Sequence, residues 1–214
     1  MKPRLALAQW RIGHPSNWDR FVDCVDSALS AARDGGAEIV VLPEYLALEL
    51  AALLPAGVRA DFVASLAALQ MFHEPWLLLF SRLARTYGLT IVAGTFLLSM
   101  PNGRYRNRCY LFTPDGKHAF QDKLTLTGFE LSAGAIEPGD ALKVFDTRHG
   151  RIAVNVCYDC EFPLYARALA EAGARLLIVP SCTDTEAGAT RVRVGCMARA
   201  LENRLIVALS VTAG

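Results

Sequence analysis

The chain has 214 residues, of which 22 are Lys or Arg and 21 are Asp or Glu, so its formal net charge is +1. This balance argues against a nucleic-acid or membrane-surface protein, because both need a basic excess gathered on one face. Hydrophobic residues make up 53% and charged residues 20%, which excludes a disordered chain and predicts a large core. With no repeat or Pro/Gly/Ser-rich linker, residues 1–214 are expected to form a single domain.

The apolar stretches and the cysteines point to a protein of the cytoplasm. The N-terminal apolar run ends before Arg11 and is too short for a signal peptide. The later runs Trp76–Phe80 and Leu205–Leu209 are far shorter than the ~20 residues that cross a bilayer. The six cysteines lie mostly inside apolar segments, as buried thiols do in a reducing compartment. We therefore expect a cytoplasmic protein with no disulfide framework.

The first half of the chain alternates between predicted strands and helices. Apolar side chains recur at helical spacing from Trp18 to Ala32, and Gly35-Gly36 ends that helix. The β-branched run Ala37–Leu42, bounded by Pro43, is typical of a central parallel strand. In chain order the predicted elements are a buried strand over 5–10, a helix from 18, a strand over 37–42, helical turns over 46–71 broken at 55–57, a helix over 74–87 and a strand over 89–95.

The second half begins with two predicted hairpins. Pro114-Asp115-Gly116 is a good turn signal between strands over 104–113 and 117–123. His149-Gly150 separates strands over 142–146 and 151–156. The remaining predicted elements are a helix over 164–172, a strand over 175–179, a helix over 190–203 and a strand over 205–211. Strands that alternate with helices, together with hairpins, predict an α/β layered sandwich with a mixed sheet.

Three polar residues stand at the ends of predicted strands, where α/β proteins often place reactive groups. They are Glu44, Lys123 and Cys157. Taken singly, each has an ordinary interpretation: a carboxylate after a strand is usually a loop or cap residue, and a lone lysine is usually solvated. A cysteine that ends an apolar strand is usually a small buried hydrophobe. Only their local contexts, taken together, support a function.

Those contexts resemble the motifs of the nitrilase superfamily, the carbon-nitrogen hydrolases. GRIAVNVCYDCEFP at 150–163 resembles the nucleophile motif of that family, and VVLPEY at 40–45 resembles its glutamate motif. DKLTLTGFE at 122–130 resembles its lysine motif with the second glutamate seven residues later. The segments LALAQW, LTIVAGT, LLIVPS and ARALEN are also similar. The resemblance covers essentially the whole chain in the order of the family.

The resemblance implies an α-β-β-α sandwich of the nitrilase type, with mixed sheets flanked by helices. It also implies that Cys157 is the nucleophile, Glu44 the general base and acid, and Lys123 an electrostatic stabiliser, while Glu130 orients the lysine or the substrate. Side-chain chemistry agrees, because a thiol with a pKa of about 8.5 needs a nearby base or cation to become nucleophilic. Glu44 and Lys123 supply one of each.

Tyr158 and Ser181 are the expected substrate-binding residues. The backbone N–H of Tyr158, next after the nucleophile, is our candidate for a second donor to the negative charge that develops on the substrate. Neither a metal nor an organic cofactor is required. The expected substrate is a small linear amide, with a nitrile or a carbamoyl amine as alternatives within the same family. The resemblance further implies a homodimer or higher homo-oligomer.

Two other chemistries use the same cysteine. Cys157-x-x-Cys160 after a strand fits a thioredoxin-like redox pair, but the helix is expected only after Pro163 and the surrounding pattern is too long for that fold. The sequence supports a zinc site less well than a redox pair. No second pair of cysteines stands at the spacing of zinc ligands, because Cys182 and Cys196 are 14 residues apart. A reversible Cys157–Cys160 disulfide would indicate the redox function.

A Cys-His hydrolase and a non-catalytic scaffold are the remaining alternatives. His149 is the histidine nearest to the nucleophile in sequence, but its place beside Gly150 favours a solvated turn residue. A scaffold would keep the fold without turnover, and the intact set of glutamate, lysine and cysteine argues against it. A single alkylatable cysteine linked to activity would indicate hydrolysis.

The chain departs from the family pattern in two places. Its Ala/Leu-rich stretch Tyr45–Pro75 is longer than in many relatives, and we expect it to cover the site and to help select the substrate. At the other end, the chain stops at residues 212–214, short of the usual edge strands. The last predicted strand, Leu205–Val211, is therefore expected to lack its usual neighbour. An open edge invites pairing with another chain, and it favours an altered interface, reduced stability or lost activity.

Overall fold

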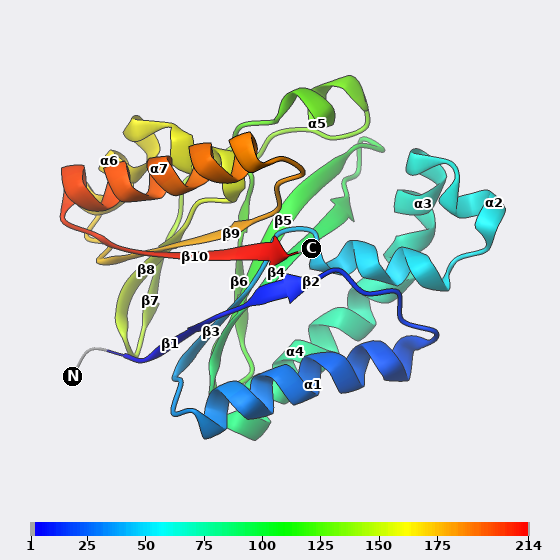
Figure 1. The fold of residues 1–214 in the computed structure, drawn as a ribbon, viewed down its shortest axis with the longest axis horizontal. Helices are drawn as coiled ribbons and strands as arrows, with labels where there is room; N and C mark the ends of the chain where they lie inside the picture. Colours follow the sequence, from blue (N-terminus) through cyan, green and yellow to red (C-terminus); the bar gives the residue numbers. More distant parts are fainter. Residues whose placement is uncertain (1–2, 214) are drawn as a thin grey trace.

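Two five-stranded sheets pack face to face in the computed structural model, which describes residues 3–213 (Figure 1). The first sheet runs β1 (Leu5–Leu7), β3 (Ile39–Leu42), β4 (Thr90–Ser99), β5 (Tyr105–Phe112) and β6 (His118–Asp122) in spatial order. The second runs β2 (Gln9–Arg11), β10 (Ile206–Ala213), β9 (Leu176–Ser181), β8 (Gly150–Val154) and β7 (Val144–Thr147). Both sheets are mixed, because the two predicted hairpins, β5–β6 and β7–β8, add antiparallel pairs to parallel strands.

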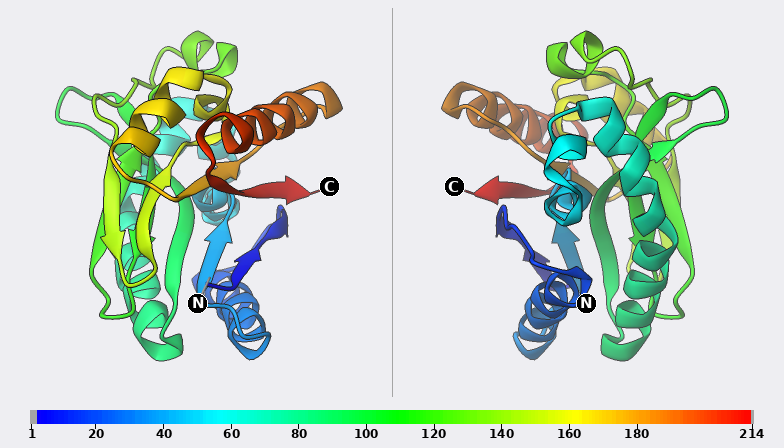
Figure 2. Two further views of the ribbon diagram at one scale, coloured as in Figure 1. Left: turned by 90° about the vertical axis from the view of Figure 1, so that its left-hand side faces the viewer. Right: turned by 90° about the vertical axis from the view of Figure 1, so that its right-hand side faces the viewer.

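Helices cover the outer face of each sheet. The helices and 3-10 turns (η) are α1 (Trp18–Asp34), η1 (Leu46–Leu53), α2 (Ala56–Arg59), α3 (Phe62–Leu69), η2 (Gln70–Phe72), α4 (His73–Tyr87), α5 (Gly128–Ser132), η3 (Cys157–Glu161), α6 (Pro163–Glu171) and α7 (Glu186–Asn203). In the side views, α6 and α7 lie over the second sheet, and α1 and α4 lie under the first (Figure 2). The α-β-β-α sandwich that the resemblance implies is confirmed.

Strand β3 shows how the two cores are built. Its four residues are all buried, and they alternate between faces as strand geometry requires. Val40 and Leu42 pack with α1 and α4, while Ile39 and Val41 pack against the second sheet. Each fully buried aliphatic side chain contributes roughly 1.5–3 kcal/mol. The run that reads as a central strand in the sequence therefore anchors both layers, and Glu44 follows directly after it.

The N-terminal strand differs from the single buried strand that we predicted. It divides at Ala8 into β1, which pairs with β3, and β2, which pairs with β10. The Ala8 amide donates to the Val41 carbonyl in the first sheet, while its carbonyl accepts from Val211 in the second. Leu7 is 42% exposed, because the strand lies at an edge of each sheet and only one of its faces is covered.

The last strand does not form the open edge that we expected. β10 lies between β9 and β2 in the second sheet, and its residues Val211–Ala213 pair in parallel with β2. The split of the N-terminal strand supplies this partner, and such pairing between distant segments could not be read from local patterns. The first residue of β10, Ile206, remains 50% exposed.

The helical run Phe62–Tyr87 is more apolar than we expected of any segment. Its 26 residues reach a mean hydropathy of 1.3 in the best window, which length and composition alone would allow in a membrane. Of that window, 28% is buried inside the structure, and Trp76, Phe80 and Leu83 of this run lie in the core beneath the first sheet. We also did not predict the short elements α5 and η3, both of which carry site residues.

Candidate active site

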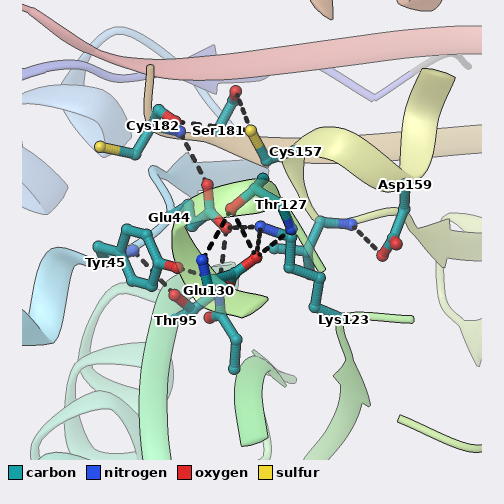
Figure 3. A network of polar contacts seen from close by, with 12 residues as sticks. Glu44, Tyr45, Thr95, Lys123, Thr127, Glu130, Cys157, Asp159, Ser181 and Cys182 are labelled. Carbon is teal, nitrogen blue, oxygen red and sulfur yellow. Dashed lines mark hydrogen bonds and ion pairs between the residues drawn. The ribbon is translucent and has the colours of Figure 1, made fainter. Parts of the chain in front are cut away.

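The three polar residues at strand ends meet in one cleft. Glu44 follows β3, Lys123 follows β6 directly, and Cys157 opens η3 just after β8 (Figure 3). The cleft has a volume of about 430 Å³. Its lining residues are Glu44, Tyr45, Lys123, Thr127, Phe129, Cys157, Tyr158, Glu161, Cys182, Thr183, Asp184, Gly188, Arg191 and Val192. Residues separated by up to 148 positions are thus brought to the same edge of the sandwich.

Lys123 is held between two buried carboxylates. Its Nζ lies 2.8 Å from Oε1 of Glu44 and 2.9 Å from Oε2 of Glu130. All three side chains are at most 1% exposed. Asn107 of β5 donates through Nδ2 to both carboxylates, at 2.9 Å to Glu44 and 3.2 Å to Glu130. Buried charges need such partners, and this network gives each charge at least two.

Helix α5 positions Glu130 through a capping box. Thr127 is the N-cap, and its hydroxyl accepts from the Glu130 amide while the Glu130 carboxylate accepts from the Thr127 amide at 2.9 Å. The Tyr45 hydroxyl also donates to Glu130. Tyr45 has a positive φ of 63°, an uncommon conformation for a bulky residue. These contacts fix the carboxylate that faces Lys123.

The nucleophile candidate lies on a strained turn. Cys157 has a φ of 46°, in the left-handed region that costs a non-glycine residue roughly 1–2 kcal/mol. Its sulfur accepts from the Ser181 hydroxyl at 3.0 Å and lies 3.6 Å from the Cys182 carbonyl. The Cys182 amide donates to Oε2 of Glu44 at 3.0 Å. A sharp turn of this kind presents a side chain at the top of a sheet.

Asp159 ties the nucleophile turn to the segment that carries Lys123. Its buried carboxylate accepts from the backbone amides of Leu124, Thr125 and Val156 at 3.1, 2.7 and 3.1 Å. Burial raises the pKa of Asp159 to about 7, although these hydrogen bonds oppose the change. Asp159 therefore links the turn that carries Cys157 to the residues that follow Lys123, and sequence reasoning did not single it out.

The environment keeps the thiol neutral and the lysine charged. Burial and the charge of Glu44 raise the pKa of Cys157 well above the range of an ordinary thiol, and Lys123 only partly offsets this. Burial alone would lower the pKa of Lys123, but Glu44 and Glu130 raise it above its usual value. Burial raises the pKa of Glu44, with Lys123 opposing. For Glu130, the effects of Lys123 and Tyr45 outweigh burial and lower the pKa.

Opposite ionisation tendencies in two neighbouring carboxylates suit two different roles. Glu44, whose pKa burial raises, lines the same cleft as Cys157, so it is placed to exchange a proton with the thiol. Glu130, whose pKa is lowered, stays ionised and keeps Lys123 charged. The arrangement can therefore deprotonate a thiol at the moment of attack and stabilise a developing negative charge.

The two expected substrate-binding residues lie in different environments. Tyr158 lines the cleft, and its amide is in the first turn of η3, where N–H groups have no intrahelical partner. Ser181 is fully buried and contacts the Cys157 sulfur instead of lining the cleft. Sequence reasoning missed Asn107. The signal that could have identified it is its position in β5, where a polar residue stands between the buried Tyr105 and Cys109.

Of the residues weighed for the alternative chemistries, Cys157 and Cys182 line the cleft, and Cys160, Cys196 and His149 do not. Cys160 is buried, and its sulfur lies 3.8 Å from that of Cys196 in α7. All six cysteines are free thiols. Between residues 3 and 213, no group of three or more His, Cys, Asp or Glu side chains is placed to hold a metal ion. His149 lies in the turn between β7 and β8 and does not line the cleft.

The long segment Tyr45–Pro75 reaches the cleft at one residue, Tyr45. Farther along, Phe62 packs edge-on against Phe129, a cleft residue, with ring centroids 5.7 Å apart. The segment is thus beside the cleft and supports part of its wall. Its role in selecting the substrate stays a prediction.

Gly94 sets the position of Glu44. It has a φ of +68°, and a Cβ there would lie 2.1 Å from the carbonyl oxygen of Pro43, the residue before Glu44. We expect Gly94→Ala to lower the free energy of unfolding by about 2–5 kcal/mol, from left-handed strain and overpacking together. Urea denaturation measures this. Gly57→Ala in α2 is the control, because nothing lies within 4 Å of its Cβ. Equal stability of the two variants would contradict the prediction.

Comparison with known proteins finds relatives of this chain. The family model described as carbon-nitrogen hydrolase matches residues 4–214. The Bacillus subtilis protein named "Probable hydrolase YhcX" is 33% identical over 211 residues, which cover 99% of this chain and 40% of that protein. Omega-amidase NIT2-B of Xenopus laevis is 30% identical over 141 residues, or 61% of this chain and 50% of that protein. The chain thus spans half or less of the length of these two relatives.

Solved structures share the fold. Nit3 of Saccharomyces cerevisiae, a member of branch 10 of the nitrilase superfamily, superposes with a TM-score of 0.74 at 25% identity, over 98% of this chain and 75% of that one. The NitFhit protein of C. elegans gives a TM-score of 0.81 at 21% identity, over 100% of this chain and 53% of that one, and shows the fold alone.

Proposed function

Because this chain belongs to the carbon-nitrogen hydrolase family, we propose that it hydrolyses the carbon–nitrogen bond of a small linear amide, with Cys157 as the nucleophile. The observation that carries the proposal is the buried set in one cleft, in which Lys123 lies 2.8 Å from Glu44 and 2.9 Å from Glu130, beside the Cys157 thiol. The names of the relatives, which include omega-amidases, support an amide over a nitrile.

The first half of the reaction forms a thioester. Glu44 takes the proton of the Cys157 thiol as the sulfur attacks the amide carbon, so a carbon–sulfur bond forms and the carbonyl π electrons move to oxygen. The Lys123 ammonium and the Tyr158 amide stabilise that oxygen. Glu44 then gives its proton to the leaving nitrogen, the carbon–nitrogen bond breaks, and ammonia or an amine departs.

The second half of the reaction releases the acid. Glu44, ionised again, takes a proton from water as the water oxygen attacks the thioester carbon. The carbon–sulfur bond then breaks, the proton returns to the sulfur, and the carboxylic acid leaves. Throughout both halves Glu130 stays ionised and holds Lys123 in place, because its own pKa is lowered by that lysine.

A screen for ammonia release tests this proposal. Purified protein is assayed with small linear amides, carbamoyl compounds and nitriles of matched chain length, with protein alkylated by iodoacetamide as the blank. Amides are expected to give the highest kcat/KM. Release from nitriles or carbamoyl compounds alone would overturn the amide assignment, and release that survives complete alkylation of Cys157 would overturn the thiol mechanism.

The acid limb of the pH profile should report Glu44. Glu44 must be ionised to take the thiol proton, so activity falls as the pH drops through its pKa. Burial raises that pKa, and we expect kcat/KM to halve at a pH above the ordinary glutamate value of about 4.3. Rates measured from pH 4 to 8 give the midpoint.

Asp159 is the control for this profile, because its pKa is also raised, to about 7. Asp159→Asn should keep the acid limb, whereas Glu44→Asp should move it. A limb that disappears in Asp159→Asn and is unchanged in Glu44→Asp would contradict the role of Glu44 as the base.

A further inference from the structure

A second pocket adjoins the catalytic cleft and plays no part in the reaction steps above. It has a volume of about 320 Å³, and two residues of the cleft, Tyr45 and Cys182, also line it. Its other walls come from residues 12–14 and from η1 and α2. We call it the side pocket. Tyr45 and Cys182 line both spaces, so the side pocket adjoins the catalytic cleft at these two residues.

Cys182 lies at the junction of the two spaces. Its amide donates to Glu44 at 3.0 Å, and its carbonyl faces the Cys157 sulfur at 3.6 Å. Figure 3 shows its own sulfur pointing away from Cys157. Cys182 therefore lines both spaces. Its backbone contacts Glu44 and Cys157 in the catalytic cleft, and the same residue forms part of the wall of the side pocket.

The side pocket contains a buried carboxylate with unused hydrogen-bonding capacity. Glu49 is only 6% exposed. Its Oε1 accepts from the Trp10 indole at 2.7 Å and from the Gly13 amide at 2.6 Å. No donor or cation within residues 3–213 lies in hydrogen-bond or ion-pair distance of its Oε2. One oxygen is thus fixed by two donors, and the other is free to accept from a molecule in the side pocket that Glu49 lines.

The chemistry of Glu49 selects the ligand. Its neighbours in the side pocket include the apolar Leu48, Ala51 and Ala52, and a carboxylate in such surroundings needs a cation or a strong N–H donor. A primary ammonium group brings a positive charge and three N–H donors. Arg59 lines the same pocket, is exposed, and has no ion pair among the described residues. It is therefore free to turn toward solvent or to bind a carboxylate next to the ammonium group.

We propose that the side pocket binds a primary ammonium group at the end of the substrate remote from the scissile amide, with Glu49 as its ionic partner. This inference rests on the proposed amide hydrolysis and names its substrate class, the linear amides that carry an amino group. The amine is that of a simple ω-amino amide or that of an amino acid with a side-chain amide. In the second case Arg59 binds the carboxylate beside the amine.

Matched pairs of substrates test the proposal. Each pair consists of an ω-amino amide and the alkyl amide of the same length, with three to five methylene groups, and kcat/KM is measured for both. The wild-type protein should favour the amino amide by about tenfold or more, the effect of a hydrogen bond to a buried charge. Glu49→Gln should remove this preference, because glutamine keeps the acceptor for Trp10 and Gly13 but turns an amide NH₂ toward the ligand. Glu74→Gln, at an exposed site on α4, is the control and should keep it.

Two further measurements keep the proposal falsifiable if Glu49→Gln folds poorly. Alkylammonium ions should inhibit the wild-type protein competitively, and alcohols of equal length should inhibit about tenfold more weakly. If Arg59→Met loses activity only toward amides of amino acids, the natural substrate is an amino acid with a side-chain amide. If Arg59→Met hydrolyses amino acid amides and simple ω-amino amides as the wild-type protein does, the substrate is a simple ω-amino amide. A wild-type protein with no preference for the amino amide overturns the inference, and so does a preference that survives Glu49→Gln.

Binding to Cys157→Ala separates this inference from the proposed function. Calorimetric titration with the amino amide and with the alkyl amide measures affinity without turnover. If no amide is hydrolysed but the amino amide binds more tightly through Glu49, the proposed reaction fails and the ammonium site stands. If amides are hydrolysed but both ligands bind Cys157→Ala equally, the reaction stands and the ammonium site fails.

Discussion

Replacing Cys157 by alanine is expected to lower kcat for amide hydrolysis by about 10⁴- to 10⁶-fold, the loss that follows removal of a nucleophile that acts together with its base. The reason is specific to this cleft, because the Cys157 sulfur is the atom that would form the thioester. Glu44 takes the proton of that thiol, and Lys123 stabilises the charge that its attack creates. Stability should change little, because alanine fits the space of the buried sulfur. Ammonia release under single-turnover and steady-state conditions measures the effect.

A second thiol variant makes this result interpretable. Cys24 lies on the exposed side of α1, so Cys24→Ala should retain wild-type turnover. Equal turnover by Cys157→Ala and Cys24→Ala would contradict the thioester mechanism. Loss of activity in both variants would point to damage from handling or misfolding, which thermal unfolding of each variant would reveal.

Lys123→Met is expected to affect stability as strongly as activity. Without the ammonium group, Glu44 and Glu130 would face each other as buried carboxylates, each at most 1% exposed. Breaking a buried ion pair by removing one partner costs about 3–5 kcal/mol, and the activity that depends on Lys123 should be lost as well. Urea denaturation at pH 7 measures the first effect and ammonia release the second.

The stability loss should depend on pH with a definite sign. In Lys123→Met the folded carboxylates have raised pKa values, because burial and their mutual repulsion are no longer opposed by a cation. A group with a raised folded pKa binds its proton more tightly in the folded state, so the stability of the variant should rise as the pH falls below neutrality. Adding Glu130→Gln to Lys123→Met should restore part of the stability and none of the activity.

Lys117 provides the matched control. Its side chain is 85% exposed and pairs with Asp115 at the surface, so Lys117→Met should leave the free energy of unfolding almost unchanged. If Lys123→Met proves as stable as Lys117→Met at pH 7, the charge of Lys123 does not balance the buried carboxylates, and the electrostatic account of the site fails.

The site residues that could be predicted from the sequence are those whose neighbouring residues form a recognisable local pattern. Glu44, Lys123 and Cys157 each follow a recognisable strand, and each stands in a segment that resembles a motif of the family. No local sequence pattern marks Asn107, the Tyr45 hydroxyl or the Cys182 amide. Their contacts join residues 63, 85 and 138 positions apart, and only the folded sheets bring those residues together.

The same distinction explains the outcome for the fold. Helical periodicity predicted α1, with its buried Phe21, Val25 and Leu29, and turn residues predicted both hairpins. The short 3-10 turn η3 has no period to reveal it, since its five residues are shorter than any amphipathic repeat. The division of the N-terminal strand depends on β10, which lies at the opposite end of the described chain.

That division has a consequence for the order in which the protein assembles on the ribosome. The Ala8 carbonyl accepts from the Ser210 hydroxyl across 202 positions, so the contact cannot form until β10 has left the exit tunnel. At roughly 5–20 residues per second, synthesis takes ~10–40 s to cover that distance. During this time β1 can pair with β3, while β2 has no partner. The joining of the two sheets is therefore expected late in folding, after each has gathered its own helices, as contacts of long sequence separation require.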